Sequence, residues 1–497
     1  MSEKSLADWQ SGAKNLGIEG RAFINGRCIE ALSGETRSTN NPANSQRIAD
    51  VAVCGIEDAD QAIKKARAAF ERGVWSQMAP ADRKMLLVHW AELIEQYTDE
   101  LALLECLDVG KPISDTSGID VPSAVRTIRW SGEAIDKVYD EISPTPANCL
   151  ALVRRLPLGV VAAIVPWNFP LSTTAWKLAP SLATGNSVIL KPASNTPLTA
   201  IRIAELATEA GLPDGVLQVL PGPGGSLGKH LATHMDIDGL TFTGSTPVGK
   251  QLMQYSGQSN LKRTFLELGG KSPNIIFADA NLHKAASMAA AAVFYNGGQT
   301  CTAGTRLIVE QKIRDQFIEM VVDKAKKWMP GDPLDPATRM GPMIDEAQYQ
   351  TVAEYVAVGR GEGAELLFGG SRVLAESGGF YIEPTIFSGV DNRMRIAEEE
   401  IFGPVLSVLT FSDAEEAVRI ANDSIYGLAG AVWSNNINTA HKIADAVRVG
   451  TMGINNYFGG DITVPFGGFK QSGNGRDKSI HAFDDYTELK TTWIEFD

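Results

Sequence analysis

One of the five cysteines, Cys301, stands among small and polar residues in the stretch Phe294-Tyr-Asn-Gly-Gly-Gln-Thr-Cys-Thr-Ala303. A lone cysteine is usually a buried packing residue, and that interpretation suits the other four. Small neighbours around Cys301 instead leave room for a substrate to approach the sulfur. Because a thiolate is a strong nucleophile, the sequence indicates Cys301 as a candidate catalytic residue.

A base for this thiol must come from elsewhere, because no histidine lies near Cys301 in the sequence. Glu267 ends an apolar run at a Gly-Gly turn, in Phe265-Leu-Glu-Leu-Gly-Gly-Lys-Ser-Pro273. A carboxyl group at this place either caps the turn or acts as a general base with a raised pKa. The residues alone leave both interpretations open.

A serine hydrolase is the competing chemistry. Gly224-Gly-Ser-Leu-Gly228 fits the G-x-S-x-G pattern, with Ser226 as the nucleophile after a predicted strand. No HGGG-type oxyanion loop accompanies it, and a chain with 48 glycines is expected to contain such a match by chance. A glycine-rich turn into a helix explains the pattern more simply, so a serine esterase is kept only as the alternative.

Two further patterns concern anions and metals. Gly244-Ser-Thr-Pro-Val-Gly-Lys250 resembles a P-loop, but Gln251 replaces the hydroxyl residue that would bind Mg²⁺. A strand that leads into a helix N-terminus still suits a pyrophosphate. His230 and His234 have the spacing of one helix face, yet no glutamate or Cys/His cluster supplies further ligands. We therefore expect a surface histidine pair and no metal cofactor.

The composition narrows the class of protein and its partners. A chain of 497 residues predicts two to three domains. It has 45 basic and 59 acidic residues and a net charge of −14, which argues against nucleic acid or an anionic membrane as partner. The scattered cysteines indicate a reducing compartment, and neither a signal peptide nor a run of 18 apolar residues is present. A soluble cytoplasmic protein is expected.

Hydrophobic periodicity predicts helices over 58–106, with caps at Asp58 and Asp82, and over 123–137. From residue 152, helices alternate with short apolar runs at 160–165, 187–190, 216–220, 240–242 and 264–268. This alternation predicts a parallel sheet with crossover helices. A second series begins near residue 272, with strands at 274–277, 306–309 and 405–411. The β-prone segment 486–496 is expected to pair with another element or another subunit.

Residues 294–303 fit the cysteine signature of aldehyde dehydrogenases, F-x-x-x-G-Q-x-C-x-A, at every fixed position, and residues 266–273 fit the glutamate signature of that superfamily. Four more blocks resemble the superfamily in the same order, at 166–170, 242–245, 399–404 and 465–473. The chain resembles an aldehyde dehydrogenase from about residue 20 to its end. The resemblance implies an α/β fold with a Rossmann-like cofactor domain, an α/β catalytic domain and a small β oligomerisation arm, assembled as a homodimer or homotetramer.

The resemblance also implies NAD- or NADP-dependent oxidation of an aldehyde to a carboxylic acid. Cys301 would form a thiohemiacetal and then a thioester. Asn168 and the Cys301 backbone N–H would bind the oxyanion, and Glu267 would activate the hydrolytic water. The implied cofactor residues are Ile164, Pro166, Trp167, Lys191, Ser194, Gly224, Gly244, Ser245, Glu400 and Phe402.

One position departs from many NAD-preferring relatives. They carry a glutamate three residues after the lysine that Lys191 matches, and this chain has Ser194 there. A carboxylate would repel a ribose 2′-phosphate, whereas a serine does not. We therefore expect NADP to be accepted as well as NAD.

Residues 294–296, 455–465 and 470–479 most resemble the γ-glutamyl-γ-aminobutyraldehyde and aminoaldehyde dehydrogenases of putrescine and polyamine breakdown. This implies an aminoaldehyde or 4-(γ-glutamylamino)butanal as substrate, with a semialdehyde or betaine aldehyde as the alternative. Asp120 and Asp461 are expected at the mouth of the site, where they would favour a distal ammonium or amide, unless they are solvated surface carboxylates. The side chains expected to line the site, or else to pack in the core, are Phe169, Trp176, Tyr295, Tyr457 and Phe466.

The expected division of the chain follows from the same resemblance. Residues 1–126 and 152–266 would form the cofactor-binding domain, and residues 267–466 the catalytic domain. Residues 127–151 and 467–497 would form the oligomerisation arm.

Overall fold

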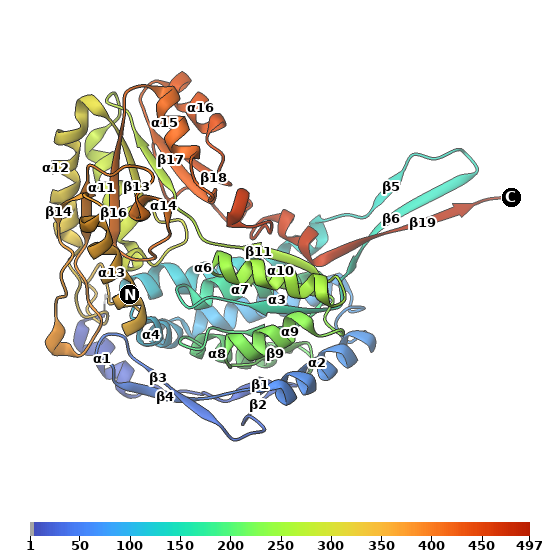
Figure 1. Cartoon of the computed structure of the whole chain (residues 1–497). Coiled ribbons are helices and arrows are strands. Elements are labelled where there is room, and N and C mark those ends of the chain that lie inside the picture. Colours follow the sequence, from blue (N-terminus) through green and yellow to red (C-terminus); the bar gives the residue numbers. More distant parts are fainter. Residues whose placement is uncertain (1–3) are drawn as a thin grey trace.

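Two seven-stranded sheets organise the protein in the computed structural model, which describes residues 4–497 (Figure 1). In the first sheet the strand order is β11-β10-β7-β8-β9-β1-β2, and in the second it is β14-β15-β16-β13-β12-β17-β18. Most neighbouring strands are parallel, and helices connect them. This confirms the predicted α/β fold.

The first sheet and its helices are built mainly from the N-terminal half. Its strands are β1 (Ala22–Ile24), β2 (Arg27–Ile29), β7 (Val160–Ile164), β8 (Ser187–Lys191), β9 (Leu217–Val219), β10 (Gly239–Thr243) and β11 (Arg263–Glu267). Its longer helices are α2 (Ile56–Glu71), α3 (Pro80–Gln96), α4 (Thr98–Val109), α6 (Val121–Ala134), α7 (Pro170–Ala183), α8 (Leu198–Glu209) and α10 (Thr246–Gln258). Shorter elements are α1 (Leu6–Lys14), the β3 (Thr36–Asn40) and β4 (Arg47–Ala52) hairpin, α5 (Ile113–Asp115) and α9 (Lys229–Thr233).

The second sheet follows in the C-terminal half. Its strands are β12 (Pro273–Ile276), β13 (Arg306–Glu310), β14 (Glu365–Phe368), β15 (Thr385–Ser388), β16 (Val405–Phe411), β17 (Ala429–Trp433) and β18 (Thr451–Ile454). Its helices are α11 (Leu282–Phe294), α12 (Arg314–Ala325), α13 (Glu346–Gly361), α14 (Arg395–Glu398), α15 (Ala414–Asn422) and α16 (Ile437–Ala446).

The central strand β7 shows why the apolar runs become buried strands. All five of its residues are buried. Val160 and Ala162 pack into one hydrophobic cluster, while Ala163 belongs to a separate cluster. Because successive side chains of a strand point to opposite faces, a sheet covered by helices on both faces needs apolar residues at every position.

Several predicted boundaries were wrong by a few residues. Helix α2 begins at Ile56, two residues before Asp58, whose carboxylate instead accepts from the Gly55 N–H at 2.8 Å. Helix α3 begins at Pro80 rather than at Asp82. The stretch that follows α4 forms α5 and a π-helical turn at Thr116–Asp120. The short strands β1, β2, β14, β15, β17 and β18 were not predicted.

A three-stranded sheet extends from the body as an arm (Figure 1). It consists of β5 (Glu141–Ser143), β6 (Cys149–Pro157) and β19 (Thr487–Glu495). The C-terminal segment therefore pairs within the chain, antiparallel to β6 from Thr487↔Pro157 to Glu495↔Cys149. Residues 127–134 belong to α6, which packs against α3 and α7, so the arm strands lie within 141–157 and 487–495.

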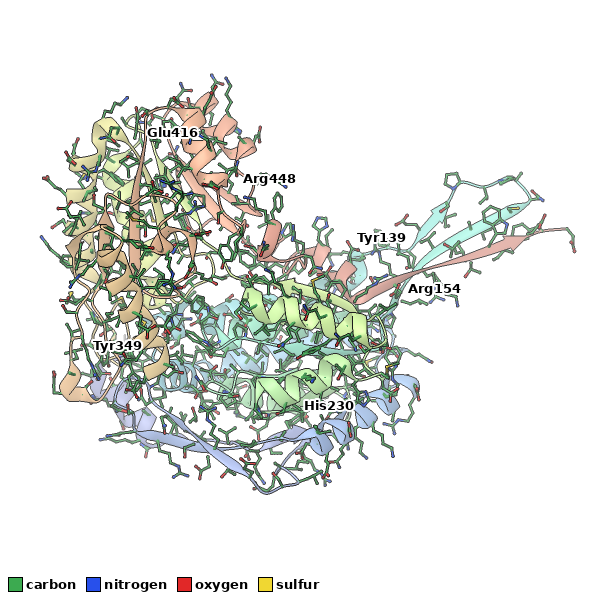
Figure 2. The ribbon with its side chains drawn as sticks, viewed as in Figure 1. Tyr139, Arg154, His230, Tyr349, Glu416 and Arg448 are labelled. Atoms are coloured by element: carbon green, nitrogen blue, oxygen red, sulfur yellow. The ribbon has the colours of Figure 1, made fainter. Side chains whose placement is uncertain are left out.

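The surface of the arm is unusually apolar for an exposed element. Ile142, Leu489 and Trp493 are all exposed, and Tyr139, near the start of the arm, is 76% exposed (Figure 2). The sheet order β19-β6-β5 leaves one edge of β19 without a neighbouring strand in the part of the chain that the structure describes. An open strand edge beside apolar side chains is a surface suited to further strand pairing.

No helix within residues 4–497 combines the length and the apolar content that a bilayer-spanning segment requires.

A buried ion pair joins helix α7 to the segment before β19. The ammonium of Lys177 lies 2.8 and 2.7 Å from the two carboxylate oxygens of Asp477. Both side chains are almost completely buried, with 3% and 4% exposed. Because a buried charge without a partner is costly, this pair fixes the position of the C-terminal segment against α7.

We expect Asp477→Asn to lower the free energy of unfolding by about 3–5 kcal/mol, because the Lys177 ammonium would remain buried without a compensating charge. Urea denaturation measures this change. Asp484→Asn is the matched control, since Asp484 pairs with Arg155 at the surface and an exposed pair contributes about 1 kcal/mol or less. Equal, small effects of the two substitutions would contradict the assignment.

Candidate active site

Cys301 and Glu267 come together although different sheets carry them. Glu267 is the last residue of β11, and Cys301 follows α11 and the turn Tyr295–Gly298. A Cβ atom on Gly270 would lie only 2.4 Å from the Cys301 carbonyl oxygen. The Gly-Gly turn after Glu267 therefore lets the two backbones approach, as only glycine permits.

The same turn is held by backbone and side-chain hydrogen bonds. The Leu268 N–H donates to the Ser472 carbonyl at 2.9 Å, and the Ser472 hydroxyl donates to the Gly269 carbonyl at 2.6 Å. The Gly270 N–H donates to the Glu400 carboxylate at 3.0 Å. Glu400, a predicted cofactor residue, thus lies against the turn that follows Glu267.

Burial dominates the protonation of both groups. It raises the pKa of Glu267 to about 8, with a further rise from the charge of Asp477 and an opposing effect of Lys177. The pKa of the Cys301 thiol is raised well above its ordinary value by burial and then by the charges of Glu267 and Glu400. Backbone N–H groups of Thr302 and Cys301 act in the opposite direction. At neutral pH both groups therefore hold their protons in this arrangement.

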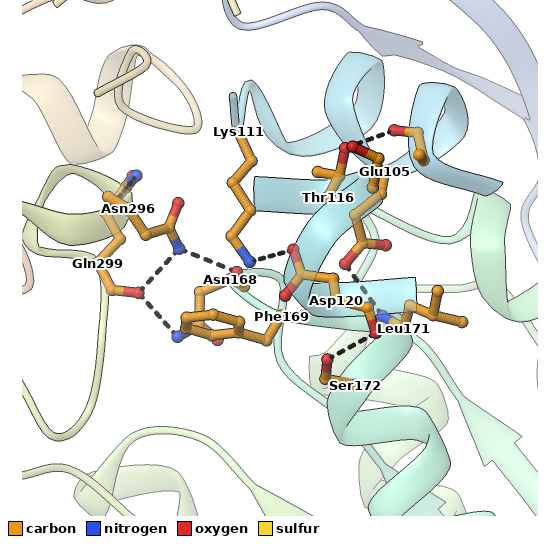
Figure 3. Close-up of polar contacts among 12 residues, drawn as sticks. Glu105, Lys111, Thr116, Asp120, Asn168, Phe169, Leu171, Ser172, Asn296 and Gln299 are labelled. Carbon is orange, nitrogen blue, oxygen red and sulfur yellow. Dashed lines mark hydrogen bonds and ion pairs between the residues drawn. The ribbon is translucent and has the colours of Figure 1, made fainter. Parts of the chain in front are cut away.

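Asn168 is fixed against the loop that leads to Cys301 (Figure 3). Its side-chain amide donates to the Gln299 carbonyl at 2.8 Å, and the Asn296 amide donates to the Asn168 carbonyl at 3.0 Å. Asn296 has a left-handed backbone with φ of 50°, which turns the chain tightly before the cysteine. The amide of the predicted oxyanion residue therefore contacts a carbonyl that lies two residues before the predicted nucleophile.

Asp120 does not lie at an opening of the site, so that expectation was wrong. It is 1% exposed, and its carboxylate accepts from the Lys111 ammonium at 2.7 Å (Figure 3). The π-helical turn that precedes α6 directs Asp120 inward, where Lys111 compensates its charge. The Lys111 ammonium also lies 3.6 Å from the centroid of the Phe169 ring. Asp461, by contrast, is exposed.

The predicted aromatic residues form two groups. Phe169 contacts Tyr295 at a ring-centroid distance of 6.1 Å, and Trp176 contacts Phe466 at 5.3 Å. Phe458, which sequence reasoning missed, joins the first group through Tyr295 and Tyr457. The Tyr457 hydroxyl donates to the Thr302 carbonyl at 2.7 Å, so Tyr457 supports the backbone next to Cys301.

A cavity of about 340 Å³ lies over the carboxyl ends of β7 and β8. Five predicted cofactor residues line it, namely Ile164, Lys191, Ser194, Gly224 and Ser245. Sequence reasoning missed Lys229, Val248, Leu252 and Tyr255, which come from α9 and α10 and also line it. These two helices carried no family motif at those positions.

The chemistry of this cavity suits a phosphate-bearing ligand. No aspartate or glutamate is among its lining residues, whereas two lysines are. Burial lowers the pKa of Lys191 to about 8, and its ammonium donates to the carbonyls of Pro192 and Gly222. Ser245 precedes the first turn of α10, whose N–H groups favour an anion.

The remaining predicted cofactor residues lie outside that cavity. Trp167 and Phe402 meet edge to face, with ring centroids 5.2 Å apart, and Phe402 has a left-handed backbone with φ of 55°. The Gly244 N–H donates to the Glu267 carbonyl at 3.1 Å. Pro166 is half-buried just after β7.

The two competing motifs have different surroundings. Ser226 is exposed in a π-helical turn, and among the described residues no hydrogen bond joins its hydroxyl to a histidine or carboxylate. His230 lies near the surface (Figure 2), with Nε2 2.6 Å from the Asp60 carboxylate. His234 faces the same carboxylate at 3.6 Å, an arrangement that the sequence did not indicate because Asp60 lies on α2.

Known proteins are similar to this chain in both sequence and fold. A profile of the aldehyde dehydrogenase family matches residues 29–492. The chain is 51% identical to the NADP/NAD-dependent aldehyde dehydrogenase PuuC of Escherichia coli (strain K12), with all of both chains covered. It superimposes on an indole-3-acetaldehyde dehydrogenase complexed with NAD+ with a TM-score of 0.99 and 59% identity, covering 99% of this chain and 100% of that one.

A third comparison concerns γ-glutamyl-γ-aminobutyraldehyde dehydrogenase from Burkholderia cenocepacia. Its crystal structure matches with a TM-score of 0.98 and 54% identity, covering 99% of this chain and 100% of that one. The chain therefore belongs to the aldehyde dehydrogenase family. Within that family it is an NAD(P)-dependent aldehyde dehydrogenase.

Proposed function

We propose that Cys301, Glu267 and Asn168 carry out the oxidation of the aldehyde to a carboxylic acid. The observation that supports this most directly is the meeting of the two signature segments at Gly270, which sets the Glu267 turn against the Cys301 backbone. The hydrogen bond from the Asn168 amide to the Gln299 carbonyl holds a side-chain amide beside the same segment. A nucleophile, a base and an oxyanion donor are thus gathered in one place.

In this mechanism the Cys301 thiol gives its proton to ionised Glu267, which passes it to solvent, and the sulfur attacks the aldehyde carbon, so that the carbonyl oxygen becomes an oxyanion. The Asn168 amide and the Cys301 backbone N–H stabilise that oxygen, and such a donor contributes about 3–4 kcal/mol. NAD(P), when bound, supplies the acceptor for the hydrogen and electron pair of the aldehyde carbon. The acyl group then remains on Cys301 as a thioester, and ionised Glu267 takes a proton from the water that hydrolyses it.

The cavity beside β8 is proposed to hold the phosphate-bearing part of the cofactor. Lys191 and Ser194 would face the adenine ribose, and Ser245 with the N-terminus of α10 would face the pyrophosphate. Glu400, Trp167 and Phe402 would orient the other end of the dinucleotide near Cys301. Ser194 and Lys229 together leave this cavity open to a ribose 2′-phosphate.

The substrate is proposed to be an aminoaldehyde or 4-(γ-glutamylamino)butanal. The names of two similar proteins support this: γ-glutamyl-γ-aminobutyraldehyde dehydrogenase and, at 43% identity, the aminoacetaldehyde dehydrogenase of Pseudomonas aeruginosa. The aromatic side chains around Phe169 and Trp176 would enclose the alkyl chain of the substrate. Since Lys111 neutralises Asp120, Asp461 is the remaining predicted carboxylate that could meet a distal ammonium.

We further propose a cytoplasmic homodimer or homotetramer that assembles through the arm. The open edge of β19 and the exposed Leu489 and Trp493 support this proposal, because such a surface is usually covered by a second chain.

We expect Cys301→Ala to abolish aldehyde oxidation and Ser226→Ala to leave kcat/KM within about twofold, because only the thiol carries the acyl group. Steady-state rates with NAD and mass spectrometry of the trapped acyl-enzyme measure this. Retained oxidation without the thiol would refute the mechanism.

In the wild-type enzyme, thioester hydrolysis should accelerate as the pH rises through about 8, because the raised pKa of Glu267 keeps the base protonated below that pH.

Ser194→Glu should lower kcat/KM for NADP by about tenfold or more while kcat/KM for NAD is kept, because the new carboxylate repels the 2′-phosphate. Lys229→Met should lower the NADP value alone, and Lys250→Met, an exposed lysine outside the cavity, should change neither. Parallel kinetics with both cofactors test this. A wild-type NADP efficiency more than about a thousandfold below that of NAD, roughly 4 kcal/mol, would rule out dual specificity.

For the substrate, we expect either 4-aminobutanal or 4-(γ-glutamylamino)butanal to be the preferred aldehyde. Its kcat/KM should exceed that of butanal by about tenfold or more. The distal polar group supplies the extra binding energy. A panel measured at saturating NAD decides the matter, with propanal and pentanal as length controls. A kcat/KM for butanal equal to both would contradict the proposed substrate class.

A further inference from the structure

The segment that carries Lys478 is fixed beside the aromatic pair Trp176 and Phe466. The backbones of Phe466 and Asp477 exchange two hydrogen bonds, both of 2.7 Å. The Ser479 N–H donates to the Ile462 carbonyl, also at 2.7 Å. Lys478 therefore stands between two backbone contacts with the stretch that follows Asp461, and the Lys177–Asp477 pair ties the segment to α7.

The Lys478 ammonium lies over these rings. Its nitrogen is 4.6 Å from the centroid of the Trp176 ring and 5.4 Å from that of Phe466. The adjacent Asp477 carboxylate already receives both of its bonds from Lys177. Within residues 4–497, no hydrogen bond or ion pair satisfies the Lys478 ammonium, so aromatic faces are its main support.

A second cation without a partner is close to the first. Arg126, on α6, lowers the pKa of Lys478 by charge repulsion, after the larger effect of burial, while Asp477, Asp461 and Cys301 act in the opposite direction. In the part of the chain that the structure describes, the Arg126 guanidinium also has no hydrogen-bond or ion-pair partner. Asp461 directly precedes Ile462, whose carbonyl accepts from the Ser479 N–H, so its exposed carboxylate lies on the stretch that is bonded to the Lys478 segment.

The backbone at this place is strained. Lys478 and Ser479 have φ values of 63° and 53°, a left-handed conformation that residues with side chains seldom adopt. Such strain persists where the surrounding structure demands it, and it concentrates at functional sites. Here it directs a long, partly exposed cationic side chain toward Trp176.

We propose that Lys478 is a specificity residue that binds a carboxylate at the far end of the aldehyde, with Arg126 beside it and Asp461 placed for an adjacent ammonium. The inference rests on the proposed function, and it selects within that substrate class. An aldehyde that ends in an α-amino acid group, as 4-(γ-glutamylamino)butanal does, presents both charges. 4-Aminobutanal presents only an ammonium, which Lys478 and Arg126 repel.

The test compares kcat/KM for 4-(γ-glutamylamino)butanal, 4-aminobutanal and butanal at saturating NAD in four enzymes: wild type, K478M, K478R and K442M. Methionine keeps the length of the side chain and removes its charge, and Lys442 is an exposed lysine on α16. K478M should lower kcat/KM for the γ-glutamyl aldehyde at least about tenfold, mainly through KM. Butanal should stay within about twofold, 4-aminobutanal should not decrease, and K478R should retain most of the wild-type preference.

An equal loss on all three aldehydes would overturn the proposal, since it would assign Lys478 a structural role. An unchanged preference in K478M would overturn it as well. The proposed function fails by a different result, namely oxidation that survives Cys301→Ala or a wild-type enzyme that oxidises butanal as well as both charged aldehydes. The two failures are therefore distinguishable.

Discussion

The close approach of the Gly269–Gly270 backbone to Cys301 is the contact on which the rest of the site depends. Side chains at either glycine would overlap the Glu400 carboxylate or the Cys301 carbonyl oxygen. This contact joins the turn after β11, in the first sheet, to the loop between α11 and β13, in the second. Glu267 ends β11 and Cys301 follows α11, so the relative position of the two sheets sets the relative position of these two side chains.

Burial then sets the chemistry of those atoms. Glu267 and Glu400 have pKa values near 8 and 7, and the Cys301 thiol is also shifted upward. The low dielectric that raises these pKa values also strengthens every hydrogen bond offered to a developing oxyanion. Burial of these groups carries a desolvation cost, but the same low dielectric strengthens their electrostatic interaction with a bound substrate.

The sequence predicted those features that depend on local chemistry. The apolar runs of β7, β8 and β10 are buried on both faces, and that burial is visible in the residues themselves. The short strands β1 and β2 were missed because three residues carry too little pattern to distinguish a strand from a loop. The catalytic signatures were found through their resemblance to a known family, and the Gly-Gly turn and the cysteine in them also have a direct steric or chemical meaning.

Residues whose role depends on tertiary partners could not be placed from the sequence. In the sequence Asp120 looked like a free carboxylate, and only the fold shows that it is paired with the Lys111 ammonium. Lys229 and Tyr255 carry no recognisable local motif, since their importance comes from what faces them across the structure. Lys478 lies in the stretch 470–479 that resembles the family, but its contact with Trp176 depends on the folded chain. Charge compensation and long-range proximity are properties of the folded chain.

The pairing of β6 with β19 joins segments separated by more than three hundred residues of sequence. A ribosome delivers the last strand only when both sheets have already emerged. Among the described sheets the arm is therefore the last to close, and β6 keeps one edge open until β19 has been made.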